Sequence, residues 1–223
     1  MPVGTPAEES REAAPPRGRP NHAPLADPLQ LAARHAMLPG AAHVAPIRAL
    51  AARIRAATAK PVPEPDPLDG GVNARLLLLL ETPGPRVRQD AIVSRDKPGG
   101  TGTNLRRFLD GAGIARRDML LWNAVPWIIH EPGARNRAPR PAEVRDGLAY
   151  LPPFLALLSN LCVIVLSGRT AAGAEATVRQ CLPDIPVLIM PHPSPTIVCT
   201  SPAIGERIEA TLAAAAAILR SAE

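Results

Sequence analysis

The sequence is poor in aromatic residues. Its 223 residues include two Trp, one Tyr and two Phe. Proteins that bind single-stranded nucleic acid without sequence preference stack successive bases on aromatic rings, and so few rings cannot form such a platform. This class of binding surface is therefore excluded.

Cysteine is also scarce. The three cysteines, Cys162, Cys181 and Cys199, form no Cys-x-x-Cys pair and show no spacing typical of a metal site. A disulfide framework, a structural zinc and an iron–sulfur cluster are not indicated, so we expect no cofactor and no bound metal. Reduced thiols fit a cytoplasmic protein, and the cytoplasm is the expected location.

Long apolar segments and a strong excess of charge are lacking as well. The run of five leucines at 76–80 is far shorter than the roughly 20 residues that span a bilayer, and the N-terminus has no apolar stretch typical of a signal peptide. We therefore expect a soluble protein. The formal net charge of +5 permits an anionic partner without requiring one, because basic surfaces also serve solubility.

The composition divides the chain into three parts. Residues 1–27 are rich in Pro, Glu, Arg and Ala and carry hardly any large apolar side chain, so we expect a disordered tail. Residues 28–70 are expected to form a helical N-terminal extension and a proline-rich linker. The apolar face of that helical pattern consists of Ile47, Leu50, Ala51 and Ile54. Residues 71–223 have a length that suits one α/β domain.

Four apolar segments of strand length alternate with helical patterns in this last part. They are RLLLLLE (75–81), DMLLWNAV (118–125), LCVIVLSG (161–168) and PVLIMPH (186–192). Each segment is apolar at nearly every position rather than at alternate positions, which indicates burial on both faces. The sequence therefore predicts an α/β fold, a three-layer α/β/α domain around a central, mainly parallel four-stranded sheet.

The segments between these strands carry helix signals. An apolar stripe through Leu105 and Phe108 predicts one helix, and Pro141 suits the first turn of another. Thr170 is predicted to cap the helix after the third strand, and Ser201 is predicted to cap the last helix. Helices would thus connect successive strands, as a parallel sheet requires.

Polar side chains follow three of the four predicted strands. Glu81 begins ETPGP, Asn123 begins NAVPW, and His192 lies in PHPSP. Ligands of open parallel sheets bind at the carboxyl ends of the strands, so we expect the three side chains to meet at one site. Each also has a structural alternative: a turn cap or an arginine pair for Glu81, a turn amide for Asn123, and a stiff proline turn for His192.

In this order the motifs resemble those of the uracil-DNA glycosylase superfamily. ETPGP is similar to the first motif, a Gly-polar-x-Pro-Gly turn, with Leu80 where glycine is usual. LLWNAV resembles the second-strand motif, LSGRTAA the Gly-x-x-Ala turn after the third strand, and HPSP the closing histidine motif. The resemblance spans roughly residues 71–223. It implies a monofunctional hydrolase of base excision repair that removes uracil or another deaminated base from DNA.

The resemblance also implies a role for each site residue. The target nucleotide would be flipped out of the duplex into a pocket, where Asn123 would accept from N3–H of uracil and donate to O4, a pattern that cytosine reverses. His192 would hydrogen-bond O2 of the leaving base. Glu81 would position water at C1′ or steady the oxocarbenium-like sugar. The base-binding set is completed by Thr82, Pro83 and Gly84.

DNA contacts are expected from four further residues. Ser194 lies in the histidine motif and is a candidate for a flanking phosphate, and Ile197 follows where the family's loop wedges into the duplex. Arg86 and Arg169 are candidate contacts to the DNA backbone, with ordinary solvated charge as the alternative. DNA is thus the expected partner, and a monomer is the default for a base-flipping enzyme of this size.

One departure from the family pattern bears on activity. The family usually places an aromatic ring after the first motif to stack on the flipped base, a contact worth roughly 1–3 kcal/mol. The corresponding segment here, SRDKPGGTGTN (94–104), has none. Trp122 and Trp127 flank the second motif and could substitute, although Trp122 also suits the core. Two hypotheses stand: a glycosylase, whose lesion could be larger than uracil, and a non-catalytic nucleic-acid or nucleotide-binding module.

Overall fold

The computed structural model of the chain describes residues 23–85, 87, 91–131, 133, 134 and 136–222. Residues 1–22 of the predicted tail lie outside the described residues, and so does Arg86, one of the candidate DNA contacts.

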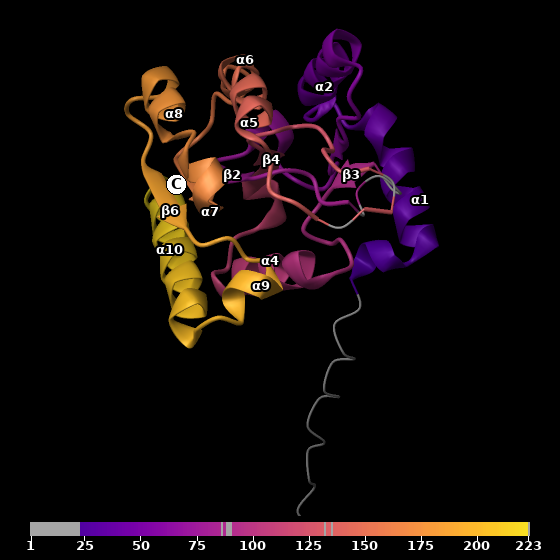
Figure 1. The fold of residues 1–223 in the computed structure, drawn as a ribbon. Coiled ribbons are helices and arrows are strands. Elements are labelled where there is room, and N and C mark those ends of the chain that lie inside the picture. The colour runs from indigo at the N-terminus through magenta and orange to yellow at the C-terminus, as the bar shows by residue number, and fades with distance from the viewer. Residues whose placement is uncertain (1–22, 86, 88–90, 132, 135, 223) are drawn as a thin grey trace, which may run out of the picture.

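A four-stranded parallel sheet forms the centre of the fold (Figure 1). Its strands stand in the order β4-β2-β5-β6, and each neighbouring pair runs parallel. The strands are β2 (Leu76–Leu80), β4 (Met119–Asn123), β5 (Val163–Ser167) and β6 (Val187–Met190). A small second sheet pairs β1 (Glu64–Pro65) with β3 (Ile92–Val93), also in parallel. The predicted α/β class with a parallel four-stranded sheet is confirmed.

Helices cover both faces of this sheet. In Figure 1, α2, α5, α6 and α8 lie on one side of it, and α4, α9 and α10 lie on the other. The α-helices are α1 (Pro28–Met37), α2 (Ala45–Thr58), α4 (Gly100–Gly111), α5 (Pro141–Leu148), α6 (Leu151–Leu155), α7 (Gly168–Ala172), α8 (Glu175–Cys181), α9 (Pro195–Val198) and α10 (Pro202–Ser221). Short 3-10 helices are η1 (Pro24–Ala26), η2 (Leu38–Gly40), η3 (Gly71–Asn73) and η4 (Arg116–Asp118). Among the described residues, no helix combines the length and apolarity needed to cross a membrane.

The leucines of β2 explain why the predicted strands are apolar at every position. Leu77 and Leu79 pack into one half of the core with residues of α2, α6 and α8. Leu76 and Leu78 pack into the other half with residues of α4 and α10. A strand in the middle of a covered sheet has no solvent-facing side, so polar residues cannot alternate with apolar ones.

Most of the predicted helix signals coincide with helices of the structure. Leu105 and Phe108 lie on the buried side of α4, and Pro141 is the first residue of α5. Ser201 caps α10 through its hydroxyl oxygen, which accepts a hydrogen bond from the backbone in the first turn. Local sequence signals therefore set the starts of these helices.

The predicted helix cap at Thr170 is wrong. Helix α7 begins at Gly168, with Ser167 before it, so Thr170 lies within the helix. Its hydroxyl donates a hydrogen bond to the carboxylate of Glu81 instead of accepting one from its own helix. A threonine near a strand end suits either role. The sequence does not show which distant carboxylate the fold brings next to it.

The N-terminal helices pack against the domain that follows them. The apolar face of α2 belongs to the same half of the core as Leu77 and Leu79. Leu25, which lies within the predicted tail, is 4% exposed, and its N–H donates to the carbonyl of Asp96 at 3.2 Å. The end of the predicted tail is therefore anchored to the fold through Leu25.

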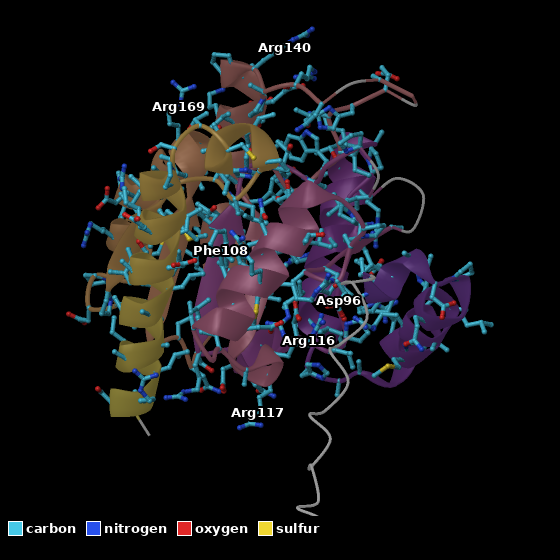
Figure 2. The ribbon with its side chains drawn as sticks, turned by 90° about the horizontal axis from the view of Figure 1, so that it is seen from below. Asp96, Phe108, Arg116, Arg117, Arg140 and Arg169 are labelled. Atoms are coloured by element: carbon cyan, nitrogen blue, oxygen red, sulfur yellow. The ribbon has the colours of Figure 1, made fainter. Side chains whose placement is uncertain are left out.

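A buried cluster of charged side chains ties this N-terminal part to the loop before α4. Arg34 lies 2.5 Å from Asp66 and 3.2 Å from Asp96. Arg116 bonds to the same two carboxylates, and Figure 2 shows it near Asp96. Arg116 also lies 2.9 Å from Asp69, but burial dominates there and raises the pKa of Asp69 to about 8. Removing either arginine would leave the buried acidic groups with only the other arginine to compensate them, which is destabilising.

Candidate active site

A pocket of about 340 Å³ opens where the carboxyl ends of β2 and β4 meet the loop before α4. Its lining includes every residue that was predicted for catalysis or base binding: Glu81, Thr82, Pro83, Gly84, Asn123 and His192. These residues follow three different strands, and the parallel order of the sheet brings them to one rim. The site therefore occupies the position at which open parallel sheets bind ligands.

Asn123 is held in the sheet at the end of β4 and is buried. It is the last residue of β4, stands opposite Leu80 of β2 in the sheet register, and is 3% exposed. Its Oδ1 is buried and has no hydrogen-bond partner among the described residues. A buried acceptor without a partner costs roughly 1–3 kcal/mol, so the pocket provides a strong preference for a ligand with a matching N–H.

His192 presents a neutral imidazole to the pocket. Its Nδ1 accepts a hydrogen bond from the backbone N–H of Ser194 at 3.1 Å, which assigns the remaining ring proton to Nε2. Burial lowers the pKa of His192 below its usual value, and the nearby charge of Glu81 only partly opposes the shift. The ring is therefore set up as a hydrogen-bond donor through Nε2 without a positive charge.

Gly168 makes room for this ring at the start of α7. Its φ is +86°, a backbone conformation that favours glycine, and a Cβ at this position would lie 3.0 Å from Cβ of His192. The glycine that opens α7 thus serves the packing of His192 as well as the turn.

Glu81 is held by its backbone and by its side chain. Its carbonyl accepts from the N–H of Val125 at 3.0 Å, and its Oε2 accepts from the Thr170 hydroxyl at 2.6 Å. The carboxylate is therefore tied to α7 across the rim of the sheet. Thr170 is a functional candidate for which the sequence predicted only a helix cap, although its place in SGRT, directly after the third strand, was the available signal.

The loop before α4 and the first residues of α4 supply another wall of the pocket. This wall consists of Lys97, Pro98, Gly99, Gly100 and Thr101, and no Trp, Tyr or Phe is found among the described lining residues. Lys97 is 8% exposed, and burial lowers the pKa of its amine to about 7. The loop at 94–104 therefore offers no ring that could stack on a base, and the rest of the described lining contains no Trp, Tyr or Phe either.

Neither tryptophan takes the place of that ring. Trp122 is buried and stacks on Phe154, with ring centroids 4.4 Å apart. Trp127 lies against Tyr150 and Lys60 and lines a different pocket. Of the two alternatives for Trp122, the structure thus selects the core.

Three of the predicted DNA contacts, Ser194, Ile197 and Arg169, belong to the described residues, and none of the three lines the pocket. Ser194 precedes α9, and its Oγ lies 3.0 Å from Oγ1 of Thr196. Ile197 is 40% exposed on α9. Arg169 of α7 is exposed at the molecular surface (Figure 2).

A second contact holds the histidine motif in place. Asn104 of α4 donates from Nδ2 to the carbonyl of Pro193 at 2.9 Å. Sequence reasoning missed this residue, because a polar side chain on the first turns of a helix is usually solvated. The bond joins the two sides of the site, which are far apart in the chain.

Possible metal ligands are not gathered at this site. Among the described residues, no group of three or more His, Cys, Asp or Glu side chains could hold a metal ion. The chemistry available to the pocket is that of a carboxylate, a neutral imidazole, a buried amide and a buried amine.

A family model matches most of the chain. The family model for UDG, the uracil DNA glycosylase superfamily, matches residues 67–215, which is more than half of the 223-residue chain. No curated protein matches the chain.

Proposed function

Because the chain belongs to the uracil-DNA glycosylase superfamily, we propose that it is a DNA repair glycosylase that excises uracil or another deaminated base from DNA. It would hydrolyse the N-glycosidic bond after the target nucleotide is flipped into the pocket. Flipping costs a few kcal/mol and is easiest at mispaired or single-stranded bases, which favours damaged sites. We propose that it acts as a monomer without a metal.

The observation that carries this proposal is Asn123, a residue of the pocket lining whose buried Oδ1 has no hydrogen-bond partner in the described structure. Uracil carries a hydrogen on N3 and could satisfy this acceptor, whereas N3 of cytosine is itself an acceptor. A cytosine would leave two acceptors facing each other, and such mismatches are rejected far more strongly than a missing methyl group. The amide therefore suits a base that has lost its amino group.

His192 would stabilise the leaving base. As the N-glycosidic bond breaks, its electrons move onto the base, and negative charge spreads to the ring oxygens. The Nε2–H of a neutral His192 can donate to O2, and this bond strengthens as the charge grows. The lowered pKa of His192 keeps its ring neutral at physiological pH. Nδ1 therefore stays unprotonated and keeps its hydrogen bond from the Ser194 N–H, while Nε2–H remains the donor.

Glu81 would act on the sugar side of the reaction. Thr170 engages Oε2, and the other carboxylate oxygen could orient a water molecule toward C1′. The oxygen of that water forms the new bond to C1′, and the carboxylate also opposes the positive charge of the oxocarbenium-like sugar. Fixing the carboxylate in advance reduces the reorganisation needed in the transition state.

The remaining predicted residues would bind the DNA around the flipped nucleotide. The turn of Thr82, Pro83 and Gly84 would contact the base, and Ser194 would contact a flanking phosphate. The exposed Ile197 would fill the space that the base leaves in the duplex. Arg169 and Arg86 would add sequence-independent contacts to the backbone.

The test is base excision by purified protein in excess over labelled oligonucleotides that carry uracil, hypoxanthine or xanthine, in single and double strands. Alkali cleaves the abasic sites that result. We expect strand breaks with the wild-type protein and a loss of at least about tenfold in Asn123→Ala and His192→Ala. Asn160→Ala, at an exposed position outside the pocket lining, should cut as the wild type does. Tight binding without any break would instead favour the non-catalytic binding module.

A further inference from the structure

Lys97 is a buried amine within the pocket that the reaction scheme above leaves without a role. It lines the same cavity as Glu81, Asn123 and His192, and 8% of its surface is exposed. It also stands in the segment where the family's stacking ring is expected and absent. An amine in this place cannot stack on a base, but it can interact with charge on one.

The backbone that carries Lys97 is firmly held on both sides. On one side, the carboxylate of Asp96 bonds to Arg34 and Arg116. The backbone N–H of Asp96 donates to Ser94 Oγ at 3.0 Å. On the other side, Gly102 packs so closely that a Cβ would overlap the carbonyl of Lys97. The N-terminal extension and α4 thus fix the loop through which Lys97 lines the pocket.

The chemistry of base removal creates a need for such a charge. When the N-glycosidic bond breaks, the pair of electrons remains on the base, water adds to C1′ of the sugar, and the proton that this water loses passes to the carboxylate of Glu81. A neutral His192 can hydrogen-bond the anionic base but cannot neutralise it. A cation in a pocket shielded from water interacts with a developing anion much more strongly than it would in bulk solvent.

We propose that Lys97 is a second catalytic residue of the glycosylase, and that its ammonium group stabilises the negative charge of the departing base. This inference rests on the proposed function. It assigns to one cation the transition-state stabilisation that is not available here from an aromatic ring. The proposed substrates are therefore bases that leave as anions. Lys97 should accelerate the reaction most for bases whose ring nitrogen is only weakly acidic, because these are the poorest leaving groups.

The protonation of Lys97 supports this role. Burial lowers its pKa to about 7, so the amine is partly charged at neutral pH before DNA binds. The titratable groups that line the pocket with it are Glu81 and His192, and the charges of Arg34, Arg116, Asp66 and Asp96 lie behind its loop. Bound phosphates and a developing base anion both favour the charged form, so the pKa in the complex is higher than 7.

The experiment compares two leaving groups under single-turnover conditions, uracil and a fluorinated uracil whose ring nitrogen is more acidic. Lys97→Met keeps the length of the side chain and removes the charge. We expect a loss on the order of a hundredfold with uracil and a loss about tenfold smaller with the fluorinated base, which needs less help to leave. The matched control is Lys60→Met, because Lys60 lies over the Trp127 ring in a different pocket. This control should keep the wild-type rate with both bases.

The dependence of the rate on pH provides the second measurement. The wild-type rate should decline as the pH rises through the pKa of Lys97 in the complex, and Lys97→Met should lack this decline. Lys97→Arg, which stays charged, should retain most of the rate and move the decline to higher pH. This arm keeps the proposal testable even if Lys97→Met does not fold.

The outcomes separate the two claims. If the wild type releases neither base, the proposed function and this inference both fall. If the wild type releases both bases but Lys97→Met slows them equally, or not at all, only the role of Lys97 is overturned. An unchanged alkaline limb in Lys97→Arg contradicts it as well.

Discussion

The hydrogen bond from Thr170 to Glu81 offers a sharp test of how the site is held together. Valine has nearly the shape of threonine but no hydroxyl, so Thr170→Val removes the donor that lies 2.6 Å from Oε2 and changes little else. A hydrogen bond to a charged group is worth about 1.5–3 kcal/mol. If this bond keeps the carboxylate in its working position, the excision rate should fall by about tenfold to a hundredfold, since about 1.4 kcal/mol corresponds to a factor of ten.

The assay is single-turnover base excision from a uracil-containing duplex, with the melting temperature measured in parallel. Thr170→Ser keeps a hydroxyl and should restore most of the rate. Thr211→Val is the matched control, because the Thr211 hydroxyl donates to the carbonyl of Arg207 on the exposed side of α10, at 2.8 Å. A wild-type rate in Thr170→Val, or an equally slow Thr170→Ser, would refute the reasoning.

Three further predictions follow from glycine geometry and buried charge. Gly168→Ala should lower both the melting temperature and the excision rate, because it combines backbone strain at φ +86° with a close contact to His192. The control is Gly113→Ala, at φ +68° with open space around it, which should lower the melting temperature alone. Excision should fall at acid pH with a midpoint below the usual histidine value of 6.5, because protonation of Nδ1 would break the bond from the Ser194 N–H. An acid midpoint at or above 6.5 that His192→Ala abolishes would contradict the neutral state assigned to the ring. Burial raises the pKa of Asp69 to about 8, so the folded state binds an extra proton between about pH 4 and about pH 8, and the free energy of unfolding should drop as the pH rises through this range. Urea unfolding of Asp69→Asn should show a weaker drop, and an unchanged pH dependence would contradict the shift.

The fold could be predicted from local patterns because they report burial directly. The leucines of β2 are apolar at every position because the strand is covered on both faces. The prediction that Glu81, Asn123 and His192 meet rested on one general property of parallel sheets, that the carboxyl ends of the strands share an edge. Neither of these two predictions depends on which helix packs against which strand.

The supporting contacts of the site depend on distances that no local pattern contains. Thr170 and Glu81 are separated by 89 positions in the chain, and the same is true of Asn104 and Pro193. Lys97 directly follows Asp96, which belongs to the buried ion cluster of Arg34, Asp66, Asp96 and Arg116, and these four residues are far apart in the sequence. Charged residues of this kind read as surface residues until the tertiary structure brings them together.

The anchoring of the N-terminal part has a consequence for the boundary of the functional unit. Arg34 reaches Asp96, the residue before Lys97, so α1 braces the wall of the pocket. We propose that residues 28–70 are required by the glycosylase-like domain at 71–223 and do not act as a separate module. A truncated chain that begins at residue 71 should therefore lose both stability and excision, and full activity of such a chain would contradict this proposal.

The most direct test of the central claim is to measure the free base released from DNA by mass spectrometry, with the protein in excess over duplexes that carry either uracil or cytosine at one position. If Asn123 reads the base during catalysis, the wild type should release uracil and no cytosine, and Asn123→Ala should release uracil at least about tenfold more slowly. No free base from any duplex that the protein binds tightly, or equal release by wild type and Asn123→Ala, would contradict the claim.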